Sequence, residues 1–210
     1  SRGKKRQGQF KNRRHILISM IDKLNDRSID LAKKTLEIEG EAIQKLRDNL
    51  DSPESAGQFA QAIQILLACQ GRIVVSGMGK SGHIAKKIAA TFASTGSPAF
   101  FVHPAEASHG DLGMVQKEDI VLIISKSGES PEIKVLVPLI KNFGNTLIAM
   151  VGNVDSYLAT SADHVINTTV TQEACPNNLA PTSSTTAQMV MGDVLAVCLM
   201  HLNGFTGNDF

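Results

Sequence analysis

Residues 72–83, RIVVSGMGKSGH, decide the fold class of this 210-residue chain. A β-branched run over 72–76 is followed at once by a glycine-rich turn, and a segment with helical character comes next. A strand, a tight glycine turn and a helix in that order begin a βαβ unit. The stretch therefore predicts a parallel sheet with helices packed on its faces.

Four more short apolar runs follow, and segments of helical character separate most of them. Near-continuous apolar strands that alternate with helices are typical of a parallel sheet covered on both faces. Because such crossovers are right-handed, the pattern predicts an α/β fold, a three-layer αβα sandwich around five parallel strands. The later strands are expected at Ala99–Val102, Ile120–Ile124, Thr146–Val151 and His164–Asn167, with helices near 81–95, 131–143, 156–162 and 184–202.

The chain ahead of the first strand has the pattern of a helical extension. Apolar residues recur near a 3.6-residue period from His15 to about Leu50, and a second helix is expected from about Ala56 to Cys69. We divide the chain into a basic arm (1–14), this extension (15–70) and the α/β domain (71–210). The extension carries more apolar surface than a solvated helix needs, so we expect it to pack on the domain or on a neighbouring subunit.

Composition narrows the class of protein. The chain is 42% apolar and only 4% aromatic, it has three widely spaced cysteines, and no run approaches the roughly 18 apolar residues of a membrane helix. With no secretory leader pattern, we expect a soluble cytoplasmic domain without a membrane partner.

Seven of the 21 basic residues lie in 1–14. A phosphate-backbone contact is one interpretation of this arm, but it lacks interleaved aromatics, so we expect a disordered or appended tail and no nucleic-acid partner.

Two loops suit a phosphate. Ser76–His83 follows the first strand and combines glycines, Lys80 and a helix N-terminus, although it matches neither the P-loop nor the dinucleotide spacing. In the second loop, Ser125, Ser127 and Ser130 surround a glycine just before Pro131 begins a helix. Hydroxyls and free backbone N–H groups together can bind a phosphate dianion. Glu132 would then lie beside the bound ligand.

Two further loops carry polar side chains. His103 and His109 lie with two carboxylates between residues 103 and 111, a spacing that fits no standard zinc signature, so we expect no metal. An acid–base pair and a merely polar loop both remain open there. The hydroxyl run at residues 182–186, just before the last helix, exceeds what helix capping needs.

Taken together, these loops resemble those of the sugar isomerase (SIS) domain family, and within it the arabinose-5-phosphate isomerases. The resemblance rests on Ser76–His83, Ala93–Gly96, His103–Met114, Glu173–Pro176 and Leu179–Thr186 in that order. It implies that residues 71–210 adopt the SIS fold and bind a sugar phosphate. It also implies the interconversion of D-ribulose 5-phosphate and D-arabinose 5-phosphate through an enediol, which supplies the synthesis of Kdo for lipopolysaccharide or capsule. No cofactor is expected. The resemblance also implies that the protein forms a homo-oligomer, expected to be a tetramer.

The resemblance places Lys80, His109 and Glu132 in the active site. Glu132 is suited to act as the base that moves the proton, and Lys80 to stabilise the negative charge on an enediolate oxygen. His109 could transfer a hydroxyl proton or assist ring opening. The expected substrate contacts come from all four loops: Ser76, Gly77, Lys80, Ser81, His103, Ser125, Ser127, Ser130, Thr182, Ser183, Ser184 and Thr185.

Two departures from the family pattern bear on activity. Relatives commonly continue into a His-Pro-Gly-Gly segment whose histidine is implicated in catalysis, and many add a pair of CBS domains; the chain ends at Phe210, before either. The alternatives are a phosphosugar-sensing regulatory module and an isomerase of another sugar phosphate. The pattern of Lys80, His109 and Glu132 favours an enzyme, and the segments around His109 and Thr182 favour a pentose phosphate.

Overall fold

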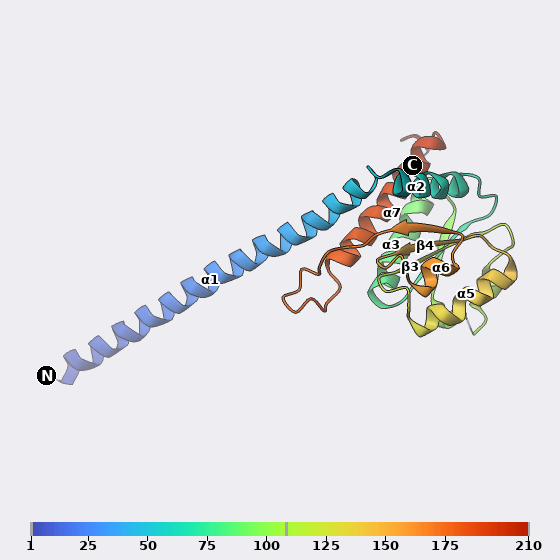
Figure 1. Ribbon diagram of the computed structural model, residues 1–210. Coiled ribbons are helices and arrows are strands. Elements are labelled where there is room, and N and C mark those ends of the chain that lie inside the picture. Colours follow the sequence, from blue (N-terminus) through green and yellow to red (C-terminus); the bar gives the residue numbers. More distant parts are fainter. Residues whose placement is uncertain (1, 108, 210) are drawn as a thin grey trace.

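The computed structural model describes residues 2–107 and 109–209, without the side chains of residues 2–19 and 22. Its elements alternate along the chain as the sequence pattern predicts (Figure 1). The strands are β1 (Ile73–Gly77), β2 (Ala99–Val102), β3 (Ile120–Ser125), β4 (Leu147–Val151) and β5 (His164–Asn167). The helices are α1 (Arg2–Asn49), α2 (Pro53–Leu67), α3 (Gly79–Ser94), α4 (Pro104–Ala107), η1 (Asp111–Met114, a 3₁₀ turn), α5 (Pro131–Phe143), α6 (Tyr157–Ser161) and α7 (Ser183–Leu202).

The five strands form one parallel sheet in the order β2-β1-β3-β4-β5. The chain leaves β1 toward β2 and then returns to add β3 on the other side of β1. Strand order therefore reverses between β1 and β3, whose register pairs Gly77 with Ile124. In open parallel sheets, ligands bind outside the carboxyl ends of the strands at this reversal. The fold confirms the predicted three-layer αβα class.

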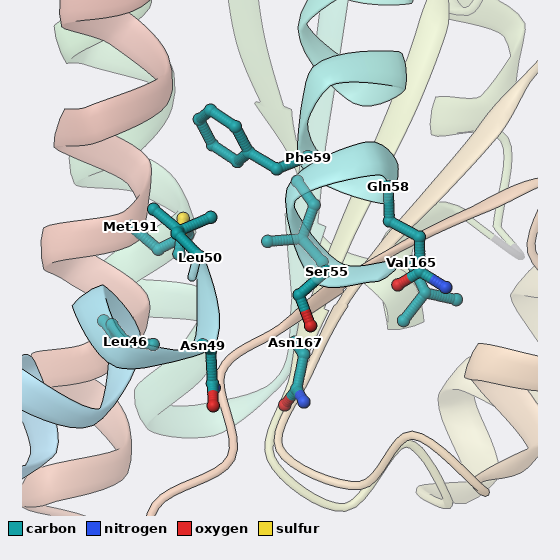
Figure 2. Close-up of a pocket in the computed structure, with 10 residues that line it drawn as sticks. Leu46, Asn49, Leu50, Ser55, Gln58, Phe59, Val165, Asn167 and Met191 are labelled. Atoms are coloured by element: carbon teal, nitrogen blue, oxygen red, sulfur yellow. The ribbon is translucent and has the colours of Figure 1, made fainter. Parts of the chain in front are cut away.

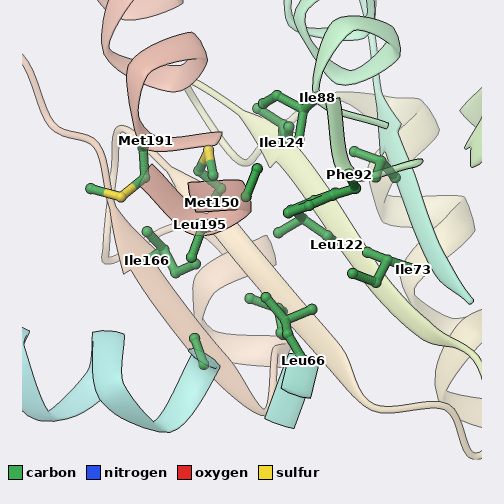
Figure 3. Close-up of a cluster of buried hydrophobic side chains, with 14 of the residues drawn as sticks. Leu66, Ile73, Ile88, Phe92, Leu122, Ile124, Met150, Ile166, Met191 and Leu195 are labelled. Atoms are coloured by element: carbon green, nitrogen blue, oxygen red, sulfur yellow. The ribbon is translucent and has the colours of Figure 1, made fainter. Parts of the chain in front are cut away.

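Alternate residues of each strand enter two separate cores. On one face, Val75, Leu122 and Met150 pack against α2, α3 and α7 (Figure 3). On the other face, Val74, Ile123 and Ala149 pack against α5 and α6. Both sets are almost fully buried, which explains why the strands are continuously apolar rather than alternating. These cores hold the strand ends, and thus the loops beyond them, in fixed positions.

The amino ends of the central strands are held by a buried carboxylate. Asp119 accepts from the backbone N–H groups of Arg72 and Gln116, and its Oδ2 lies 2.9 Å from Arg72 Nη2. Desolvation opposes ionisation, but these hydrogen bonds and the guanidinium charge lower the Asp119 pKa. Asn145 donates from its amide to three carbonyls of the same turn, including that of Asp119 at 2.8 Å. This network serves the fold, at the opposite end of the sheet from the serine loop.

Helix α7 is the central helix of the first core. It is long and apolar enough to span a membrane by length and composition alone, but in this structure it packs against α1, α2 and α3. Ala187, Leu195 and Leu199 are buried in this contact. A Cβ on Gly192 would lie 2.3 Å from Ile88 Cδ1, so the glycine allows α3 and α7 to pack closely. The apolar composition of α7 is accounted for by the core.

Helix α1 projects away from the α/β domain, and only its last turns touch the domain (Figure 1). Ala42 and Leu46 are buried, and Thr186 on α7 donates to Glu39 Oε2 at 2.6 Å. Along the projecting part, by contrast, Leu24 is 61% and Leu36 74% exposed. For residues 1–14 the sequence predicts a disordered or appended tail; in the structure the backbone is helical from Arg2 onward, and Ser1 lies outside the described residues.

Candidate functional site

The candidate site lies at the carboxyl ends of β2, β1 and β3, which are neighbours in the sheet. The loop after β1 carries Lys80 in the first turn of α3, and the loop after β3 carries Glu132 in the first turn of α5. His109 follows α4 in the connection that leaves β2. The three residues predicted to be catalytic therefore follow the carboxyl ends of three strands that are neighbours in the sheet.

The first glycine-rich loop brings α3 close to the sheet. A Cβ on Gly82 would lie 2.5 Å from the Gly77 carbonyl oxygen, and one on Gly77 would lie 2.9 Å from that of Ile124. These glycines thus let the helix begin directly over β1 and β3. Lys80 is exposed at this start, and Ser81 is partly buried. Ser76 instead is buried in β1 and donates its hydroxyl to the Val102 carbonyl at 2.7 Å, so this hydroxyl is occupied within the sheet.

The serine loop, residues 125–130, is closed by its own hydroxyls. Ser125 Oγ accepts from the Gly128 N–H at 2.9 Å, and Ser127 Oγ accepts from the Glu129 N–H at 3.3 Å. Gly128 has a φ of +66°, which favours glycine, and it turns the loop toward α5. Ser130 Oγ is buried at the start of α5 and has no hydrogen-bond partner among the described residues. A buried hydroxyl without a partner is available to a ligand.

The serine loop is fastened to α6 on one side. The backbone N–H of Leu158 donates to the Gly128 carbonyl at 3.1 Å, and that of Tyr157 donates to Glu129 Oε1 at 2.6 Å. Glu129 also forms an ion pair with Lys134 at 2.7 Å. The Lys134 ammonium and the Tyr157 N–H lower the Glu129 pKa. These contacts fix the loop without using the three serines.

A buried glutamate fastens the serine loop on the other side. Lys126 Nζ lies 2.7 Å from Glu173 Oε1, and the Glu173 side chain is fully buried. The same carboxylate accepts from the Ser184 hydroxyl at 2.5 Å and from the N–H groups of Thr182 and Ser184. Desolvation would raise its pKa, but the Lys126 ammonium and these donors lower it to about 2. Glu173 lies in one of the segments that carry the family resemblance, but neither it nor Lys126 was among the predicted site residues.

Most hydroxyl groups of residues 182–186, at the start of α7, form hydrogen bonds within the protein. Thr182 Oγ1 accepts from the Ala174 N–H at 2.8 Å, and Thr185 Oγ1 donates to the Thr182 carbonyl at 2.9 Å. Ser184 donates to Glu173, as described above. Ser183 Oγ is the exception, because it is buried without a partner in the described part of the chain. The side chains of Thr182, Ser184 and Thr185 thus build the loop that carries Glu173.

The two histidines differ in setting. His103 is partly buried, its Nδ1 accepts from the Ala105 N–H at 3.3 Å, and its ring lies edge-on to Phe101 at 6.3 Å. His109 is exposed and its backbone N–H donates to the Glu106 carbonyl at 2.9 Å. His103 is therefore the structurally engaged histidine of the pair, whereas the imidazole of His109 faces solvent. Across residues 2–107 and 109–209, no three His, Cys, Asp or Glu side chains form a metal-binding group.

A small cavity elsewhere is separate from these loops. It lies between the end of α1, the start of α2, β5 and α7, and Figure 2 shows Phe59, Leu46 and Met191 around it with Asn49 and Asn167 at its edge. None of the residues selected from the sequence lines it. Its apolar walls suit packing at the junction of the helical extension with the domain rather than phosphate chemistry.

The chain is similar in sequence and in fold to known sugar isomerase proteins. Residues 66–198 match the SIS domain family model. The chain is 54% identical over 182 residues to arabinose 5-phosphate isomerase KdsD of Pseudomonas aeruginosa, and 47% identical over 197 residues to arabinose 5-phosphate isomerase KpsF of Escherichia coli O6:H1. These alignments cover 87% and 94% of this chain but 54% and 59% of the relatives, so the chain spans little more than half their length.

A solved structure is similar over nearly its whole length. It is an E. coli CFT073 protein in complex with arabinose 5-phosphate, 46% identical to this chain, with a TM-score of 0.83. The alignment covers 88% of this chain and 96% of that one. The fold is thus shared with a protein that was solved with this sugar phosphate bound.

Proposed function

This chain belongs to the SIS domain family, and we propose that it is an aldose–ketose isomerase that interconverts D-ribulose 5-phosphate and D-arabinose 5-phosphate. One observation carries the proposal: the serine loop lies at the strand-order reversal beside Lys80 and Glu132, and its Ser130 hydroxyl is buried without a partner among the residues that the structure describes. The names of the two similar isomerases and the arabinose 5-phosphate complex of the E. coli CFT073 protein support this substrate pair.

The serine loop binds the phosphate in this proposal. Ser127 is exposed, Ser130 has a buried hydroxyl that no described residue bonds, and the N-terminus of the 13-residue α5 follows directly. A helix N-terminus adds unpaired N–H groups and a partial positive charge, both of which favour a phosphate dianion. Ser125 acts by shaping the loop, since its hydroxyl accepts from Gly128. Ser81 and Gly77 border the phosphate from the β1 side, with His103 as a weaker contact; Ser183 is fully buried and is not counted among the contacts.

Glu132 performs the proton transfer. In the ketose-to-aldose direction its carboxylate removes a proton from C1, which gives an enediolate, and it returns the proton to C2. The Lys80 ammonium stabilises the negative charge on the enediolate oxygen. His109 moves the hydroxyl proton from O1 to O2 in this direction, because an imidazole can both accept and donate a proton. One carbon is oxidised as its neighbour is reduced, so the step balances within the substrate and needs no cofactor.

The wider setting is part of the same proposal. The product supplies Kdo synthesis for lipopolysaccharide or capsule, and the enzyme works in the cytoplasm. It acts as a homo-oligomer, expected to be a tetramer. The exposed apolar side chains of α1, among them Leu24 and Leu36, support association because patches of this kind are usually covered.

The direct test is to incubate the purified chain with ribulose 5-phosphate and to measure arabinose 5-phosphate by chromatography. We expect conversion to equilibrium, and a Ser127→Ala variant with a raised KM and a nearly unchanged kcat. Parallel incubations with a hexose phosphate and a heptose phosphate test whether the protein isomerises another sugar phosphate instead. Conversion of one of those sugars but not of the pentose phosphate, or binding of the pentose phosphate without turnover, would overturn the proposal.

A further inference from the structure

We infer that Glu39, in the last turns of α1, is a positioning residue for phosphate binding, and that it acts by holding the start of α7 in place. The inference rests on the proposed function only in taking residues 125–130 as the phosphate loop. It adds to that function a residue from the helical extension, outside the α/β domain that carries the predicted site residues.

The contact between α1 and α7 includes a short hydrogen bond to a carboxylate. Thr186 Oγ1, on the fourth residue of α7, donates to Glu39 Oε2 at 2.6 Å, and the two residues lie 147 positions apart in the chain. Hydroxyl groups that donate to carboxylates form shorter and stronger bonds than those between neutral groups. Both residues are partly buried, so water competes less for this bond than it would at the surface.

Two carboxylates hold the start of α7 from two sides. Ser184 donates to Glu173, which also pairs with Lys126 of the serine loop, whereas Thr186 donates to Glu39. Residues two apart on a helix point about 200° away from each other, so the two bonds lie on opposite sides of α7. The start of α7 is therefore fixed between α1 and the serine loop, and a rotation of α7 about its axis would break one of the bonds.

Packing fixes the direction of the Glu39 side chain. Ala42 and Leu46 follow it at three and seven positions, on the same face of α1, and both are buried against the domain. Lys45 Nζ also lies 3.4 Å from Thr171 Oγ1, in the connection between β5 and α7. Helix α1 thus contacts both this connection and the start of the helix that follows it.

Loss of Glu39 would loosen the serine loop indirectly. The Thr186 hydroxyl would lose its acceptor, and the start of α7 would be held from one side only. Preorganised groups bind a ligand with less loss of freedom, so a looser loop binds phosphate more weakly. Glu132 lies on α5, which packs on the opposite face of the sheet from α7. The proton-transfer step should therefore change less than phosphate binding.

The test uses Glu39→Ala, Thr186→Val and the double variant, with Glu41→Ala as the matched control. Glu41 has the same charge, is exposed on the same helix and forms no described hydrogen bond or ion pair. Inorganic phosphate affinity is measured by calorimetry, KM and kcat by turnover of ribulose 5-phosphate, and Tm by thermal denaturation. We expect each single variant to lose about threefold to tenfold in phosphate affinity, as for residues that act through a chain of contacts. KM should rise more than kcat falls, and Glu41→Ala should match the wild type.

The double variant and a conservative variant separate positioning from mere stability. If Glu39 acts through Thr186, the double variant loses no more affinity than the weaker-binding single variant. Glu39→Gln keeps an oxygen that can accept from Thr186, so it should retain more phosphate affinity than Glu39→Ala. Multiplied losses in the double variant, equal losses in Glu39→Gln and Glu39→Ala, or a lowered Tm with unchanged phosphate affinity would overturn the inference.

The remaining outcomes are also decisive. Should Glu39→Ala not fold, Thr186→Val decides alone, and phosphate affinity equal to that of Glu41→Ala refutes the inference. A wild type that binds no phosphate overturns the phosphate loop and this inference together. Because phosphate binding is measured without turnover, phosphate binding without isomerase activity would refute the proposed function and leave this inference standing.

Discussion

Gly128 lies directly against Ser156: a Cβ at residue 128 would be 2.1 Å from Ser156 Oγ. The serine is buried at the start of α6, where its Oγ accepts from the Ala159 N–H, so it cannot easily move aside. Gly128 also has a φ of +66°. The serine loop thus depends on this glycine both for its turn and for its closeness to α6.

Gly128→Ala should disrupt the serine loop. The left-handed backbone conformation alone costs about 1 to 3 kcal/mol for a residue other than glycine, and the clash with Ser156 adds to it. We expect a lower Tm together with weaker inorganic phosphate binding, measured by thermal denaturation and calorimetry. Gly57→Ala is the control, because nothing lies within 4 Å of a Cβ on this α2 residue. Equal phosphate affinity in the two variants would contradict the assignment of the loop.

Ser76→Ala should affect stability rather than substrate binding. Its buried hydroxyl donates to the Val102 carbonyl across β1 and β2, and the carbonyl would be left without this donor. We expect the free energy of unfolding to fall by about 1 kcal/mol, the usual value for one hydrogen bond. Denaturant unfolding gives the stability and steady-state kinetics the KM. A KM raised several-fold at unchanged stability would instead make Ser76 a direct substrate contact.

Glu132→Gln should keep binding and lose turnover. The amide has nearly the same shape as the carboxylate but cannot accept the proton from carbon, and general bases contribute about 10²-fold or more. We expect kcat to fall by at least about 10²-fold while inorganic phosphate affinity is unchanged. Lys141→Gln, in the last turn of α5 and paired with Asp163 rather than with the serine loop, is the comparison on the same helix. Near-normal turnover in Glu132→Gln would show that another group is the base.

Acid should destabilise the protein in part through Glu173. Its pKa is lowered to about 2 in the folded state from an ordinary value of 4.5. Stability from this ionised group is therefore complete above about pH 4.5 and is lost as the pH falls toward 2. We expect the wild type to lose more unfolding free energy between these pH values than Glu173→Gln, as measured by denaturant titration. Parallel pH curves for the two proteins would contradict the lowered pKa.

The projecting part of α1 should mediate self-association. Met20, Leu24 and Leu31 share one stripe of this helix, and Ile29, Leu36 and Ile43 form a second stripe on the opposite side, while the exposed Glu37 lies between the two. Leu24→Asp with Leu36→Asp should reduce the mass measured by sedimentation, because a charge in an apolar interface is costly. Glu37→Lys, on the polar face between the stripes, should leave the mass unchanged. A monomeric wild type would exclude association through α1.

Element positions followed closely from the sequence. The expected strands Ala99–Val102 and His164–Asn167 and the helix over 131–143 coincide with β2, β5 and α5, because short apolar runs mark the strands and Pro131 marks the start of the helix. The short α4 and the 3₁₀ turn η1 were not predicted, since four-residue helices carry no periodicity. The basic arm, which the sequence predicts to be a disordered or appended tail, is continuous with the backbone of α1.

The sequence alone determined the class of fold and the loops that carry chemistry, because apolar periodicity and runs of serine and glycine are local properties. It also pointed to Lys80, His109 and Glu132, which follow the carboxyl ends of neighbouring parallel strands and therefore lie at the same edge of the sheet. Only the tertiary structure revealed which hydroxyls are free. Ser76 and Ser184 resemble ligand contacts in the sequence, yet one is bonded to Val102 and the other to Glu173. Hydrogen bonds between residues far apart in the chain depend on packing, so Glu173 and Lys126 became visible as a pair only in the folded protein.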